Sequence, residues 1–228
     1  HCFLERGRMV SRAAAFAIAG SAGAATLTAA SAPSPLYPDY QRLWGFSTFT
    51  LTVIFAVYVF ALITALLTVG SLSDRVGRRP VASAALVLLA LGMLLFASAG
   101  GPGGLMAARI VQGFAVGTAT ATMTAMIMDT APNRRSGSTV SSAAPALGIV
   151  IGAALSGALV EFAPHPRELV FWLLASTHLV LAGLVWLIPE NISDTTTVRA
   201  SVARSLLPSI GLPPPTRPTF FALIRSEE

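Results

Sequence analysis

The 228-residue chain has few charged residues, a single cysteine and no lysine. Charged residues make up 11% of it, whereas a soluble domain has about 25%. Such a chain cannot cover a water-facing surface with charge, and several of its runs of about 20 residues have no polar face. The sequence therefore predicts that a lipid bilayer surrounds the protein.

The scarcity of cysteine and of catalytic motifs excludes several kinds of site. Cys2 has no second cysteine to pair with, which excludes an internal disulfide and a cysteine-based metal site. No HExxH, CxxC, GxSxG or phosphate-loop pattern occurs, so no motif predicts an enzyme, a metal or another cofactor.

The positive charge is carried by arginine, with 15 arginines against 10 acidic residues. A basic balance can indicate nucleic acid, but these arginines form no stripe with interleaved aromatic residues. They gather in short loops and tails, as is typical of membrane proteins. We therefore expect no nucleic-acid partner.

Six apolar segments, bounded by glycine, proline or charge, can each cross a bilayer. At about 1.5 Å per residue each is long enough for a hydrocarbon core of about 30 Å. Helices are expected, because lipid cannot satisfy open backbone groups. The predicted fold class is an all-α integral membrane protein with six transmembrane helices, over residues 13–36, 48–70, 80–100, 104–128, 137–161 and 169–189.

The expected organisation is a cytoplasmic tail (1–12), a six-helix bundle (13–189) and a cytoplasmic linker (190–228). Near its end the linker contains PTFFALI, which suggests the start of a seventh span in a longer protein. The first segment also resembles a secretory signal cleaved after Ala32. We favour a retained helix, with Met9 as a plausible start, because five further spans follow.

The distribution of arginines predicts the orientation. With both termini in the cytoplasm, Arg42 and Arg167 lie outside and Arg109 lies within a span, which leaves 12 of the 15 arginines inside. This asymmetry follows the positive-inside rule. We expect a multi-pass protein of the cell membrane.

The stretch GSLSDRVGRRP, residues 70–80, places one acid and three arginines between the second and third segments. It resembles the G-x-L-x-D-R-x-G-R-R/K loop of the major facilitator superfamily. An inside loop that merely collects arginines would need neither the acid nor the glycines at these spacings. The matching residues are Gly70, Leu72, Asp74, Arg75, Gly77, Arg78 and Arg79.

The fourth segment supports this resemblance. Its ARIVQGFAVGTA is similar to the R-x-x-x-G-x-x-x-G pattern of the same family, through Arg109, Gln112, Gly113 and Gly117. The resemblance implies that this chain is the N-terminal half of a protein that normally has two six-helix halves facing each other across a central cavity.

The resemblance implies a secondary active transporter that moves a small solute by alternating access. Proton coupling is expected, because no nucleotide-binding motif exists to use ATP. The partners would be the bilayer, a small-molecule substrate, protons and the missing C-terminal half. The alternative is an accessory six-helix membrane protein with a structural or interaction role. The sequence does not determine the substrate, the direction of transport, or whether the transporter is a symporter or an antiporter.

Small residues predict two close helix contacts. Gly113 and Gly117 are four residues apart and form a groove for a neighbouring helix. Gly148, Gly152 and Ser156 form a similar stripe in the fifth segment.

Polar residues inside the spans are candidates for coupling or for the cavity. Arg109 costs at least about 2.5 kcal/mol if it is unpaired in the bilayer, and the resemblance gives its counterpart a part in coupling; the alternative is snorkelling to the outer headgroups. Thr118 and Thr122, one turn apart like Thr120 and Thr124, either touch substrate or bond their own helix. His178 is either a packed polar residue or a proton carrier.

The loop at 70–80 has a further expected role. Asp74 lies four residues before Arg78, and Asp129 ends the fourth segment at the same membrane level. The resemblance implies that such groups lock the two halves on the inner side. We expect a partly buried charge network of these three residues that stabilises the outward-facing state; alternatively, the arginines only set topology.

Overall fold

The structure, a computed structural model, describes residues 10–69, 76–163 and 165–189. Within these ranges it contains six long helices and no strand. All six are long and apolar enough to cross a membrane. The predicted class, an all-α membrane bundle of six transmembrane helices, is confirmed.

Several predictions of the sequence fall outside the described residues. These include most of the N-terminal tail and the whole of the linker at 190–228. Within the charged loop, Gly70, Asp74 and Arg75 also lie outside them, so their roles stay predictions.

The long helices follow the predicted segments closely, except that the first and the sixth segment run past Ser31 and Leu184, where their helices end. Pro33 and Pro35 follow the first helix, and proline cannot donate the backbone hydrogen bond that would continue it. The expected segment 13–36 is therefore wrong at its end, because the helix stops at Ser31 and a short 3₁₀ turn, η1 (Ser34–Leu36), and a short helix, α2 (Tyr37–Trp44), come next. The long helices are α1 (Arg12–Ser31), α3 (Thr48–Val69), α5 (Arg78–Ala97), α6 (Pro102–Thr130), α7 (Arg134–Phe162) and α8 (Pro166–Leu184), and a 3₁₀ turn, η2 (Val185–Leu187), follows α8.

Local sequence explains where several helices begin and end. Pro102 opens α6, at a position where its missing N–H costs nothing. The Asn133 side chain caps α7 by accepting a hydrogen bond from the Ser136 backbone N–H at 2.8 Å. Gly45 ends α2 in the left-handed region, at φ 63°.

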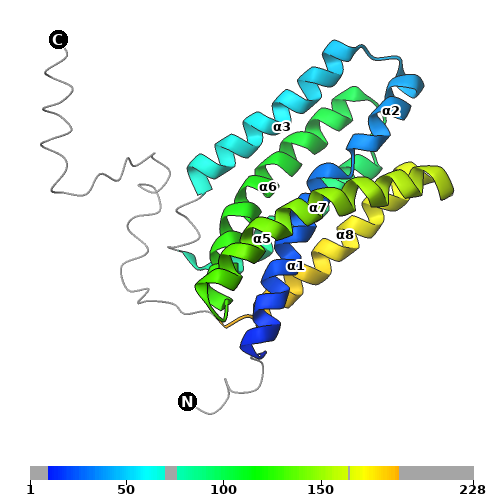
Figure 1. The fold of residues 1–228 in the computed structure, drawn as a ribbon. Coiled ribbons are helices and arrows are strands. Elements are labelled where there is room, and N and C mark those ends of the chain that lie inside the picture. The colour runs from blue at the N-terminus through cyan, green and yellow to red at the C-terminus, as the bar shows by residue number, and fades with distance from the viewer. Residues whose placement is uncertain (1–9, 70–75, 164, 190–228) are drawn as a thin grey trace, which may run out of the picture.

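Helix α6 is the centre of the bundle (Figure 1). It packs against α1, α3 and α5, while α7 lies on α1, and α8 lies mainly on α5. We call the end where α1, α5 and α7 begin the arginine end, since Arg12, Arg78 and Arg134 open these helices. The opposite end, where α2 lies, is the Tyr37 end.

Helices α3 and α7 contact the rest of the bundle along only a narrow part of their surface. In the apolar span of α6, 61% of the residues are buried, against 17% in α3 and 22% in α7. Large apolar side chains such as Phe60 and Val150 are exposed on these two helices. Exposed apolar surface of this extent is what lipid or another membrane-embedded body covers.

The groove predicted at Gly113 and Gly117 holds α3. A Cβ at Gly117 would lie 2.6 Å from the Leu62 carbonyl oxygen, and one at Gly113 would meet the Tyr58 carbonyl oxygen. No side chain fits at such a distance. The missing side chains therefore let the backbones of α6 and α3 approach directly.

The stripe on α7 makes the equivalent contact with α1. A Cβ at Gly148 would meet the Ala24 carbonyl oxygen, and one at Gly152 would meet the Thr28 carbonyl oxygen. Ser156 continues the stripe and is fully buried. The close packing expected for these residues is present.

We predict that Gly113→Ala destabilises the bundle, whereas Gly157→Ala does not. The new methyl group at Gly113 forces α3 away from α6, at a typical cost of about 1–3 kcal/mol for overpacking. A Cβ at Gly157 meets nothing within 4 Å. Thermal unfolding of the detergent-solubilised protein measures both variants, and equal midpoints would contradict the direct backbone contact.

Candidate functional site

Arg109, on α6 near the Tyr37 end, is a buried cation. Its side chain is 1% exposed. Nε donates to the Tyr37 hydroxyl at 2.6 Å, and Nη1 donates to Gln112 Oε1 at 2.6 Å and to the Ala30 carbonyl at 3.3 Å. The guanidinium therefore forms its hydrogen bonds inside the bundle and does not reach its surface.

Aromatic rings enclose the Arg109 guanidinium. Its central carbon lies 5.2–5.6 Å from four ring centroids, within the range of cation–π attraction. No carboxylate among the described residues pairs with it. The rings supply the negative potential that a carboxylate would otherwise provide, and they belong to Tyr37, Phe55, Tyr58 and Phe96.

The same cluster ties α6 to the end of α1. Gln112 donates through Nε2 to the Ala29 carbonyl at 2.7 Å, next to the Ala30 carbonyl that Arg109 contacts. Both carbonyls lie in the last turn of α1, where the helix dipole is negative. Nη2 of Arg109 is buried and has no hydrogen-bond partner in the described part of the chain.

Sequence reasoning identified Arg109 and Gln112 but missed the rings around them. Tyr58 gave the one available signal, since a hydroxyl-bearing ring sits inside the long apolar run of 48–70. Phe55 and Phe96 cannot be told from lipid-facing phenylalanines in the sequence.

The arginine end brings two of the predicted charged residues together. Arg78, at the start of α5, forms an ion pair with Asp129 near the end of α6. Their side chains are 30% and 57% exposed. This pair joins two of the three residues of the expected network, and the role of the network stays a prediction. Gly77, with φ 107°, precedes α5 in a conformation that favours glycine, and Arg79 follows Arg78 in the first turn.

Arg12 also binds the end of α6. Its Nη2 donates to the Ala131 carbonyl at 2.9 Å, and its Nε lies 3.4 Å from the Thr130 carbonyl. The last carbonyls of a helix lack partners within it and carry negative potential, so a guanidinium is favourable there. Arginines of α1 and α5 thus converge on the end of α6.

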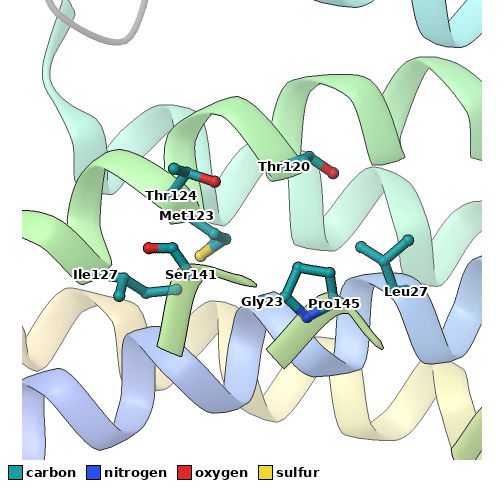
Figure 2. A pocket seen from close by; sticks show the side chains of 8 residues that line it. All are labelled: Gly23, Leu27, Thr120, Met123, Thr124, Ile127, Ser141 and Pro145. Atoms are coloured by element: carbon teal, nitrogen blue, oxygen red, sulfur yellow. The ribbon is translucent and has the colours of Figure 1, made fainter. Parts of the chain in front are cut away.

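A recess opens between α1, α6 and α7 (Figure 2). It is shallow, and its volume reaches about 220 Å³ only when the open space in front of it is included. Figure 2 shows Thr120 and Thr124 of α6 and Leu27 of α1 around it, with Ser141 of α7 beside Met123. No lining side chain is charged, and the full lining is Gly23, Leu27, Thr120, Met123, Thr124, Ile127, Ser141 and Pro145.

The recess carries hydroxyl groups on an otherwise apolar surface. Thr124 is exposed and Thr120 is half-buried. The Ser141 hydroxyl oxygen is buried without a hydrogen-bond partner among the described residues. A polar group in this state costs free energy unless a molecule in the recess bonds it.

The threonines chosen from the sequence lie elsewhere. Thr118 and Thr122 are buried, and each donates at 2.9 Å to a carbonyl of its own helix, Phe114 and Thr118 respectively. Neither lines the recess. The other pair, Thr120 and Thr124, lines the recess, whereas the bonds of Thr118 and Thr122 to their own helix match the second alternative from the sequence.

The model of the Major Facilitator Superfamily matches residues 5–226. The chain belongs to this superfamily. The match covers almost the whole sequence, including the charged loop and the α6 segment that carried the resemblance. The chain is therefore a multi-pass membrane protein of a transporter family.

A curated relative is the Multidrug resistance protein MdtL of Klebsiella pneumoniae (strain 342). The two are 32% identical over 98 residues, which is 43% of this chain and 25% of the relative. The matched part thus spans about a quarter of the relative's length.

We predict that Arg109→Lys destabilises the protein. A lysine ammonium cannot reach the Tyr37 hydroxyl, Gln112 and the Ala30 carbonyl together, and hydrogen bonds to charged groups contribute about 1.5–3 kcal/mol each. The matched control is Arg42→Lys, because Arg42 is 79% exposed in its pair with Asp39. Surface changes of that kind stay within about 0.5 kcal/mol. Thermal unfolding in detergent measures both, and equal losses would contradict the role of the cluster.

Proposed function

We propose that this chain is one half of a proton-coupled secondary transporter that moves small organic molecules by alternating access. The recess between α1, α6 and α7 carries the proposal. It carries the hydroxyls of Thr120, Thr124 and Ser141 within membrane-spanning helices, where lipid offers no hydrogen-bond partner. A substrate and an opposing six-helix half would satisfy that surface.

The recess supports a mainly apolar substrate. Leu27, Met123, Ile127 and Pro145 supply most of its surface, and a methionine adapts to ligands of different shape. The hydroxyls add a few hydrogen bonds without charge. A relative is named as a multidrug resistance protein, which supports drug-like organic molecules as the substrate class.

Arg109 and Gln112 would take part in coupling through α1. They hold the end of α1 at Ala29 and Ala30, and the same helix forms the floor of the recess at Gly23 and Leu27. A change in the charge around Arg109 would thus be felt where the substrate lies. Gly113 and Gly117 let α3, which carries two of the rings, follow α6.

The charged loop would act as an inner latch between the two halves. The Arg78–Asp129 pair supports this role, with Asp74, Arg75 and Arg79 as its expected neighbours in the loop and Gly70 and Gly77 as its turns. In this proposal the arginine end lies on the cytoplasmic side of the cell membrane, as the positive-inside rule requires.

Transport is tested by measuring solute uptake into proteoliposomes that contain the full-length gene product, under an imposed pH gradient. We expect accumulation of ethidium or Hoechst 33342 that a protonophore abolishes. Ser141→Leu fills the recess, and its initial rate should fall about tenfold or more, as pockets discriminate at the level of single methylene groups. Ser176→Leu, the same change on an exposed face of α8, should transport normally.

Two outcomes would contradict the proposal. Transport that persists without any gradient would exclude proton coupling. Equal rates of Ser141→Leu and Ser176→Leu would remove the recess from the substrate path.

The latch is tested by cysteine accessibility on the outer side of the full-length protein. Arg78→Ala and Asp129→Asn should shift the population toward the inward-facing state by up to about fivefold, since a partly exposed ion pair contributes about 1 kcal/mol or less. Arg135→Ala removes an exposed arginine of the same end and should insert normally without a shift. Equal behaviour of all three variants would leave topology as the purpose of the loop.

A further inference from the structure

His178 is a fully buried imidazole between α8 and α1. Its side chain is 0% exposed. Nδ1 lies 2.6 Å from the Leu174 carbonyl of its own helix, and Nε2 lies 3.2 Å from the Ala25 carbonyl of α1. Each ring nitrogen is therefore placed to donate a hydrogen bond to a carbonyl oxygen.

A neutral imidazole satisfies only one of these two carbonyls. It carries one N–H, and its other nitrogen is an acceptor, whereas the imidazolium donates from both nitrogens. With its proton on Nδ1, the nearer contact, neutral His178 turns the Nε2 lone pair toward the Ala25 carbonyl oxygen. Two acceptors then face each other in a buried place, and a second proton turns this contact into a hydrogen bond.

We propose that His178 is a proton-binding site and that its second proton, on Nε2, joins α8 to α1. Ala25 lies between Gly23 and Leu27, which form the floor of the recess. A proton on His178 and a molecule in the recess would thus act on the same turn of α1. Only this consequence for transport rests on the proposed function.

No other charge in the described helices takes over this role. The elements packed against α8 are α1, α5, α7 and η2. Their charged side chains and those of α8 all lie in end turns, whereas His178 and Ala25 lie in inner turns. These side chains are Arg12, Arg78, Arg79, Arg134, Arg135, Glu161, Arg167 and Glu168.

The first test reads the protons directly on the unmodified full-length protein. Nitrogen-15 NMR of labelled histidines in detergent, with His178→Gln used only for assignment, distinguishes the two neutral tautomers from the cation. Between about pH 8 and about pH 5, the range in which histidine titrates, we expect the Nδ1–H tautomer to gain a proton on Nε2. Absence of that second proton, or a neutral form with its proton on Nε2, would overturn the proposal.

The second test measures the movement. Spin labels at Leu27 on α1 and Leu179 on α8, in a Cys2→Ser background, report the distance between the helices. We expect a pH-dependent shift of about 1–2 Å, typical of helix adjustments. His178→Gln should abolish it and His165→Gln, at an exposed histidine, should keep it. A shift that survives His178→Gln would refute the link.

Neither readout uses substrate or a gradient, so the two proposals fail separately. Gradient-driven transport without titration of His178 would leave the proposed function intact and remove this site. Titration of His178 in a protein without proton-driven transport would leave this site intact and remove the proposed function.

Discussion

Lipid offers apolar side chains the same surroundings as a neighbouring helix, and the whole bundle depends on this constraint. Helices in a membrane gain little by hiding apolar surface, so they associate through close contact. Alanine is the commonest apolar residue in the buried core of the described helices. At Gly113 and Gly148 the contact is between backbones. Such contacts fix the positions of the helices. Each buried polar group must then form its hydrogen bonds with the groups that lie next to it in this arrangement.

Buried polar side chains that bond another helix do so mostly to backbone carbonyls of α1. Arg109 and Gln112 of α6 donate to its last turn, and His178 of α8 reaches it at Ala25. In return, Arg12 of α1 binds the end of α6. Helix α1 thus serves as the common hydrogen-bond acceptor of the bundle. It also forms the floor of the recess, so polar contacts and ligand surface meet on one element.

The sequence predicts the six helices well because their apolar runs are long and their ends carry glycine, proline or arginine. It predicts poorly which face of a helix is buried and which lines the recess. Helix α6 is apolar nearly all round, so no periodicity tells Thr118 and Thr122 from Thr120 and Thr124. The ring cluster around Arg109 escapes prediction because its members come from three other elements. The end of the first helix was missed because hydropathy alone runs on through Pro33.

The enclosure of Arg109 bears on the order in which the protein is made. Chains are synthesised from the N-terminus, and early segments take up structure first. Tyr37, Phe55, Tyr58 and Phe96, like the carbonyl of Ala30, all precede Arg109 in the chain. When α6 leaves the ribosome, the rings and the carbonyl that receive its charge have already been made. Arg109, the side chain that is most costly to place in the membrane, is thus synthesised after the groups that surround it. Gln112, which follows it in the chain, is the exception.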